Sequence, residues 1–224
     1  MKRRSALLLL ALTGLAGCAG AGADEPDVSA SAVPAADLIW PLRDAGLDAG
    51  FCFTLVEKLK PNQVIERLGG RELERVEWHQ LVGPGDGEAD ASKRYFAGLA
   101  RIGDWTLIVE DAGELGVTEE IVRPLSEGRA VLAYRSDATG RGHLLVLEDE
   151  QVLLDFDSET PERWGGSRPG DFVPAMRAAG LLEGTDVTEP TGPALAFLAA
   201  RTGVALTREQ LTERTYVLVT VPKR

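Results

Sequence analysis

Downstream of residue 36, the chain alternates between apolar runs with the spacing of strands and apolar runs with the spacing of helices. Six runs rich in branched or alternating apolar residues predict strands, because every second side chain of a strand faces the same side. Gly103-Asp104 can form a two-residue hairpin turn between the runs that end at 102 and begin at 105. Asp149-Glu150 can form an acidic turn between the runs that end at 148 and begin at 151. The predicted strands are 95–102, 105–110, 130–135, 144–148, 151–156 and 215–221.

Helical spacing is found in several segments on either side of these strands. In residues 61–68, Pro61 suits the first turn, three apolar residues share one face, and Gly69-Gly70 can adopt the left-handed conformation that ends a helix. Residues 72–82 fit either a helix or a strand. The other predicted helices are 51–59, 117–127 with Pro124 near its end, 172–179, 194–201 and a short one from Arg208.

Strands in succession, with helices before and after them, predict a fold of the α+β class. We expect a single domain over residues 37–224, because this length suits one core and contains no internal repeat or low-complexity stretch. The predicted architecture is an antiparallel meander of about five to six strands with flanking helices that cover one face of the sheet.

The first eighteen residues have the pattern of an export signal. A basic segment, residues 2–4, precedes an apolar run that is shorter than the roughly 20 residues needed to span a bilayer. Leu15-Ala16-Gly17-Cys18 resembles the lipobox of bacterial lipoproteins. This resemblance implies that residues 1–17 are removed and that the Cys18 thiol receives a diacylglyceryl group. The alternative is an ordinary signal peptide cut within 19–23, and export by the general or the twin-arginine route stays open.

Residues 18–36 consist almost entirely of Ala, Gly, Ser, Asp, Glu and Pro. Such a composition cannot bury enough surface to offset the entropy of ordering, so we expect a flexible tether. Each buried methylene of an attached lipid contributes about 0.8 kcal/mol, so two or more acyl chains on Cys18 would hold the protein firmly. The expected location is therefore the extracytoplasmic face of the cell membrane.

The chain carries a formal net charge of −11, and loss of the three basic residues of the signal leaves 21 basic against 35 acidic residues, or −14. Nucleic acid is disfavoured as a partner, because affinity for phosphates comes largely from clustered Lys and Arg. Basic peptides and wall components stay compatible with this charge. With Cys18 lipidated, Cys52 is the only remaining thiol, so no intramolecular disulfide can form.

Several motifs lie at 50–56 with Pro61, at 103–110, at 125–128, at 161–166 and at 202–207. The strongest is the Trp-Thr-x-x-x-Glu strand from Trp105 to Glu110. Together these segments resemble an uncharacterised domain family common in actinobacteria, over roughly residues 51–211. Members usually continue with an Asn-Gly turn, where this chain has Asp111-Ala112-Gly113. The resemblance implies the extent and topology of the domain, and it implies no activity because none is established for the family.

Catalysis by Cys52 would need a thiolate beside a histidine or another positive charge, and His79 and His143 are the only histidines. The neighbouring Phe51 and Phe53 instead predict a buried, unreactive thiol. Two histidines and one cysteine are also a poor ligand set for zinc. We therefore assign no catalytic residue and expect no cofactor.

Asp155, Asp157 and Glu159 are the weak candidates for metal ligands. If the strand continues through all three, their spacing of two places the carboxylates on one face, where they could share a hard cation. The simpler interpretation is a solvated acidic strand end, and no metal is assigned.

Trp105, Glu110, Arg163 and Trp164 are the candidates for a recognition surface, because Trp and Arg are favoured interface anchors and a Glu-Arg pair could orient them. The alternative is a core tryptophan at position 105 and a structural ion pair. We expect a recognition module for a protein or cell-wall partner rather than an enzyme. The alternative function is a carboxylate-based hydrolase of the cell envelope, in which Glu110 and Asp155 act as general acid and base in one pocket.

Overall fold

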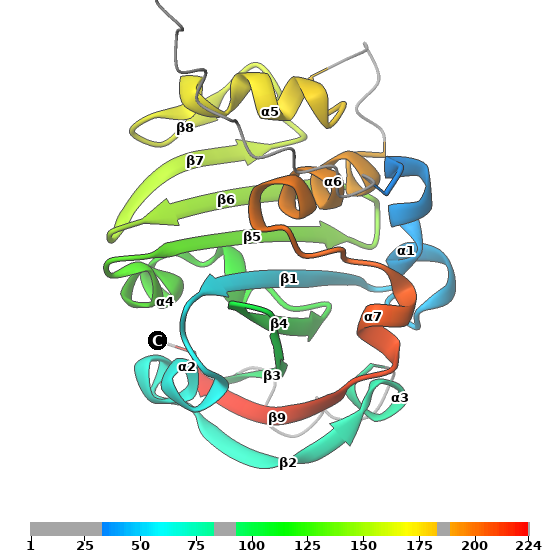
Figure 1. Ribbon diagram of the computed structural model, residues 1–224, viewed down its shortest axis with the longest axis vertical. Helices are drawn as coiled ribbons and strands as arrows, with labels where there is room; N and C mark the ends of the chain where they lie inside the picture. Colours follow the sequence, from blue (N-terminus) through cyan, green and yellow to red (C-terminus); the bar gives the residue numbers. More distant parts are fainter. Residues whose placement is uncertain (1–32, 83–92, 183–188, 224) are drawn as a thin grey trace, which may run out of the picture.

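The computed structural model describes residues 33–82, 93–182 and 189–223, and its strands form one antiparallel sheet. The strand order is β2-β9-β3-β4-β1-β5-β6-β7-β8, which runs from the bottom to the top of Figure 1. The strands are β1 (Gly50–Glu57), β2 (Arg71–Glu77), β3 (Arg94–Ile102), β4 (Trp105–Asp111), β5 (Ala130–Asp137), β6 (Gly142–Glu148), β7 (Gln151–Asp157), β8 (Trp164–Gly165) and β9 (Thr215–Pro222).

Short helices connect the strands and cover the sheet. The α-helices are α1 (Pro41–Asp44), α2 (Pro61–Leu68), α3 (Trp78–Leu81), α4 (Glu119–Val122), α5 (Val173–Ala178), α6 (Thr191–Thr202) and α7 (Arg208–Thr212). The 3₁₀ helices are η1 (Ala35–Ile39), η2 (Leu115–Val117), η3 (Arg123–Ser126) and η4 (Pro169–Phe172). The predicted α+β class is confirmed, whereas five to six strands was too low a count for the nine of the described ranges.

Strand β1 corrects the helix predicted for residues 51–59. It is the middle strand of the sheet and pairs with β4 on one side and β5 on the other. All residues from Phe51 to Val56 are 0% exposed. A strand buried on both faces is apolar without alternation, so its sequence pattern does not distinguish it from a buried helix.

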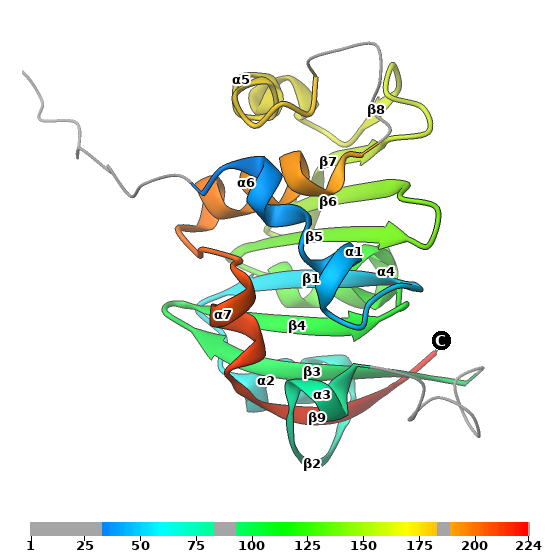
Figure 2. The same cartoon turned by 90° about the vertical axis from the view of Figure 1, so that its right-hand side faces the viewer.

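Helices cover both faces of the sheet, whereas the sequence predicted cover on one face. One core contains Phe51, Phe53 and Leu55 of β1 and packs against α3, α5, α6 and α7. The other core contains Val56 and packs against α2, η2, α4 and η3. Figure 2 shows α6 beside β5 and β6, and α3 beside β9 and β2. The domain therefore has three layers, and a site can form on either face of the sheet.

Several local predictions are confirmed. β3 and β4 form the hairpin joined at Gly103-Asp104, and β5, β6 and β7 form the predicted meander. α2 spans 61–68 and ends at Gly69, which has a left-handed φ of 64°. Residues 72–82, which fitted either a helix or a strand, are divided between β2 and α3.

The N-terminal predictions fall on residues that precede this structure. Residues 1–17, Cys18 and the tether up to residue 32 lie outside the described residues. The first described helix, η1, begins at Ala35. No helix of the described ranges combines the length and apolarity needed to cross a membrane.

Candidate functional site

A pocket of about 260 Å³ contains Trp105, one of the residues that the sequence predicted for recognition. Trp105 is the first residue of β4, directly after the hairpin turn, and its half-buried indole packs against the core that α6 covers. β5, β6 and β7 supply the rest of the sheet side of the pocket. η4 and the end of α6 close it from the other side, through Phe172 and Arg201. We call this hollow the Trp105 pocket.

The base of the Trp105 pocket is apolar. Leu132 and Val146 come from the sheet, and Phe172 packs against Phe197 of α6 with ring centroids 6.3 Å apart. Ligand pockets of proteins commonly measure about 300–1,000 Å³. This pocket, at about 260 Å³, is smaller than that range, so it suits one terminus or one side chain of a larger ligand.

Arginines and carboxylates surround the mouth of the pocket. The Arg168 guanidinium lies 3.5 Å from the Glu148 carboxylate and 3.9 Å from that of Asp171. The Arg201 guanidinium lies over the Phe172 ring, 5.5 Å from its centroid, and it has no ion pair or hydrogen bond with any residue that the structure describes. The charge of Arg201 is therefore available to an anionic ligand at the mouth of the pocket.

Sequence reasoning missed Phe172, Arg168 and Arg201. All three lie far from Trp105 in the chain, and they reach it because η4 and α6 fold back over the sheet. The only local signal is the position of Arg201 in the last turn of a predicted helix, where a cation is common for reasons unrelated to binding. Their convergence depends on tertiary packing.

Glu110 lies on the opposite face of the sheet from the Trp105 pocket. Its carboxylate is 1% exposed and accepts hydrogen bonds from the backbone amides of Leu115, at 3.1 Å, and Gly116, at 3.2 Å. Burial raises the pKa of Glu110 to about 7, although these two amide hydrogen bonds favour the charged form. The side chain ties η2 to the sheet and has no access to solvent.

Cys52 and Thr54 of β1 complete the surroundings of Glu110. The Cys52 sulfur lies 3.9 Å from the Thr54 hydroxyl, and its Cα pairs with that of Glu110 across the β1–β4 ladder. Burial, together with the nearby Glu110 carboxylate, raises the pKa of the Cys52 thiol. The predicted buried thiol is confirmed, and its environment disfavours the thiolate that a nucleophile requires.

Arg163 and Trp164 lie at the far end of the sheet. Trp164 belongs to β8 and donates its indole N–H to the carbonyl of Pro161 at 2.6 Å, and Arg163 is exposed just before it. Five strand spacings separate β8 from β4, so Glu110 and Arg163 do not pair. Trp164 packs on the same core as Trp105 but does not line its pocket.

The acidic residues around β7 each have a separate partner. Asp155 accepts a hydrogen bond from His143 at 2.7 Å, which lowers the pKa of Asp155. Asp157 accepts the backbone amide of Glu159 at 2.8 Å, and the Glu159 carboxylate pairs with Arg141. β7 ends at Asp157, so the alternation that would bring Glu159 to the same face ends before it. No group of three or more metal-ligating side chains occurs within the described ranges.

Glu110 and Asp155 do not share a pocket. They lie on β4 and β7, and β1, β5 and β6 run between them. With strands about 4.8 Å apart, four spacings correspond to about 19 Å. This distance is too large for a carboxylate pair that acts on one bond, since even inverting glycosidases keep the two groups within about 9.5 Å.

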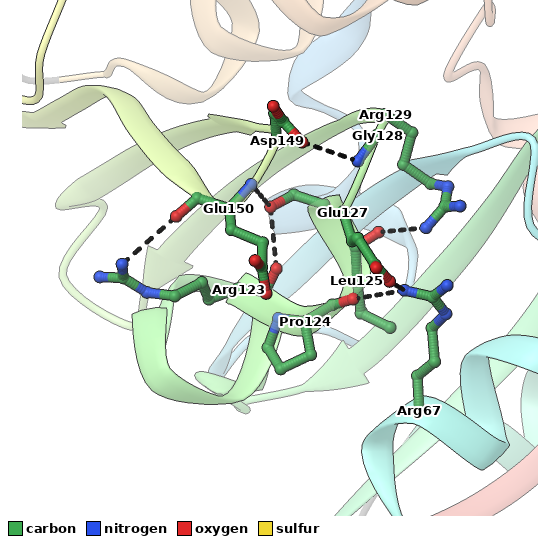
Figure 3. A network of polar contacts seen from close by, with 10 residues as sticks. Arg67, Arg123, Pro124, Leu125, Glu127, Gly128, Arg129, Asp149 and Glu150 are labelled. Carbon is green, nitrogen blue, oxygen red and sulfur yellow. Dashed lines mark hydrogen bonds and ion pairs between the residues drawn. The ribbon is translucent and has the colours of Figure 1, made fainter.

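The motif at residues 125–128 has a structural role (Figure 3). The Ser126 hydroxyl donates to the carbonyl of Arg123 at 2.8 Å and accepts the amide of Glu150 at 3.0 Å. The Asp149 carboxylate accepts the amide of Gly128 at 3.2 Å. Asp149 and Glu150 both have positive φ, so these bonds hold a tight turn between β6 and β7. Arg67 links α2 to the same region through its contact with Glu127 at 2.8 Å.

Fold and pocket together define a three-layered α+β protein whose antiparallel sheet presents a small aromatic pocket with an arginine at its mouth. The chain belongs to a family described as a family of unknown function (DUF6461), whose model matches residues 31–224. No curated protein and no solved structure matches the chain.

Proposed function

We propose that the protein is a lipid-anchored binding protein of the extracytoplasmic membrane face, and that its folded domain binds a ligand in the Trp105 pocket. The lipobox at Leu15–Cys18 supports the anchor. The Arg201 guanidinium supports the binding role, because it lies over the Phe172 ring at the mouth of the pocket without an ionic partner among the described residues. Arg201 is exposed at the pocket, so its guanidinium can form charge-assisted hydrogen bonds with an anionic ligand without moving.

The pocket suits a ligand that presents a carboxylate beside a small apolar group. The apolar part would contact Trp105 and Phe172, and the carboxylate would bind Arg201. Its volume of about 260 Å³ accommodates a peptide terminus rather than a whole peptide. A wall peptide that ends in D-alanine has this chemistry and occurs on the same side of the membrane as the proposed anchor.

Arg201→Gln is expected to weaken binding of a peptidoglycan stem pentapeptide ending in D-alanyl-D-alanine. A hydrogen bond to a charged group contributes about 1.5–3 kcal/mol, so the loss of affinity should be about tenfold or more. Isothermal titration calorimetry of the native chain in detergent measures the effect. Arg177→Gln is the matched control, because Arg177 is an exposed arginine of α5 that does not line the pocket. Equal affinities of the Arg201 variant and the native chain would contradict this role.

Cys18→Ser is expected to abolish incorporation of radiolabelled fatty acid and to move the protein from the membrane fraction to the soluble fraction. The thiol is the attachment point that the lipobox resemblance implies, and a serine hydroxyl does not form the thioether. Cys52→Ser is the control, because Cys52 is buried in β1 and should leave labelling unchanged. Continued labelling of the Cys18 variant would refute the anchor without bearing on the Trp105 pocket.

A further inference from the structure

A second hollow lies on the opposite face of the sheet from the Trp105 pocket, between the start of α2 and the outer strands β2, β9 and β3. It is a groove of about 450 Å³, and none of its lining residues lines the Trp105 pocket. Ile65, Leu99 and Val217 form an apolar base that belongs to the core under α2. The polar side chains around this base therefore decide what the groove can hold.

Positive charge dominates the rim of the groove. Lys60, Arg75 and Arg101 line it together with a single carboxylate, that of Glu72. The chain as a whole has a net charge of −11. A local excess of cations on an acidic protein creates a field that attracts anions to this one place and repels other cations.

The cations differ in how they are held. One nitrogen of Arg101 donates to the carbonyl of Leu59 at 2.7 Å, and another lies 3.7 Å from the carboxylate of Asp104, so this guanidinium has a fixed position. Lys60 and Arg75 form no ion pair with any residue in the described part of the chain, and both are exposed. Their charges are available to a ligand, whereas the charge of Arg101 is shared with Asp104.

Asn62 adds a neutral donor to the same rim. It is the second residue of α2, and it lines the groove together with Lys60. Two cations and a carboxamide at separate points suit an anion that carries several acceptor oxygens around one central atom. A planar carboxylate offers only two such oxygens. The apolar base then has room for a short organic group attached to that anion.

We propose that this groove binds the phosphate group of an anionic ligand, with Lys60 and Arg75 supplying the charge and Asn62 a hydrogen-bond donor. A soluble phosphate ester and a glycerophosphate lipid headgroup share this chemistry. The inference depends on neither the Trp105 pocket nor the lipid anchor, because the residues that carry it belong to neither.

NMR titration of the full, unacylated chain (Cys18→Ser), labelled with ¹⁵N, tests the proposal with inorganic phosphate and with glycerol 1-phosphate as probes. We expect the carboxamide signal of Asn62 and the guanidinium signal of Arg75 to shift on addition. The double variant Lys60→Glu, Arg75→Glu should bind glycerol 1-phosphate about tenfold more weakly or worse, since it loses two charge-assisted contacts. Arg177→Glu, which adds a similar negative charge outside the groove, should leave the affinity unchanged.

Flotation with vesicles separates the two sources of phosphate. A lipid headgroup is identified if the chain binds phosphatidylglycerol vesicles but not phosphatidylcholine vesicles, and if the double variant loses this binding. A soluble ester is identified if the chain binds glycerol 1-phosphate in solution. The proposal is overturned if neither probe shifts Asn62 and neither vesicle is preferred, or if Arg177→Glu weakens binding as much as the double variant. Arg201→Gln should bind the phosphate probes normally, so failure of the Trp105 pocket and failure of the groove are distinguishable.

Discussion

The free energy of unfolding is expected to depend on pH, changing by about 3 kcal/mol as Glu110 titrates. Glu110→Gln should abolish this change. Burial raises the pKa of this carboxyl from 4.5 to about 7 in the folded protein. The folded state therefore binds the proton more tightly than the unfolded state does. The resulting stability is fully present below about pH 4.5 and is lost as the pH rises through about 7.

Burial sets the sign of this effect, and the groups that face Glu110 adjust its size. Beyond burial, the carboxylate of Glu114 raises the pKa of Glu110 further, whereas the hydrogen bond from the uncharged Cys52 thiol lowers it. The amides of Leu115 and Gly116 donate to the carboxylate, and they thereby partly offset the rise in pKa caused by burial and by Glu114. Glutamine keeps one carbonyl acceptor for these amides and cannot ionise, so the variant retains the packing and loses the titration.

Chemical denaturation at a series of pH values between 4 and 8 measures this difference. Glu120→Gln is the matched control, because Glu120 is an exposed glutamate of α4 near the same region. We expect the control to keep the slope of the native chain across this window. A Glu110→Gln variant with the native slope would show that another group is responsible.

The strands differ in how clearly the sequence predicts them, and the reasons are physical. The β3–β4 hairpin and α2 were predicted because glycine and proline mark their turns and ends, and these are local signals. β1 has no alternation because both of its faces are buried, and β2 has none because it is an edge strand with one buried residue in seven. β8 has two residues, too few for any pattern.

The candidate site was predictable only in part. Trp105 was selected by residue type and does line a pocket, but Phe172 and Arg201 join it through contacts that span most of the chain. Glu110 was grouped with Trp105 although five positions separate them in one strand. Side chains an odd number of positions apart point to opposite faces, so the same sequence already contained the signal that they do not share a surface.

Gly116→Ala is expected to destabilise the protein by about 3 kcal/mol or more, the upper part of the range for inserting a methyl group into a packed core. A Cβ atom at position 116 would lie 2.7 Å from the Cys52 sulfur and much closer still to the Thr54 hydroxyl. Both neighbours belong to β1, which is hydrogen-bonded on both sides and cannot move away. η2 would therefore be displaced, and Glu110 would lose an amide that now donates to its carboxylate.

A double-mutant cycle makes this prediction specific to the contact with β1. Thr54→Ala removes the nearest atom, so the pair Gly116→Ala, Thr54→Ala should lose less stability than the sum of the two single changes. Gly170→Ala is the control, because a Cβ there would meet no atom within 4 Å. Thermal and denaturant unfolding of the four variants give the comparison. If Gly116→Ala is as stable as Gly170→Ala, the close packing of η2 on β1 does not restrict position 116 to glycine, and the burial of Glu110 does not depend on it.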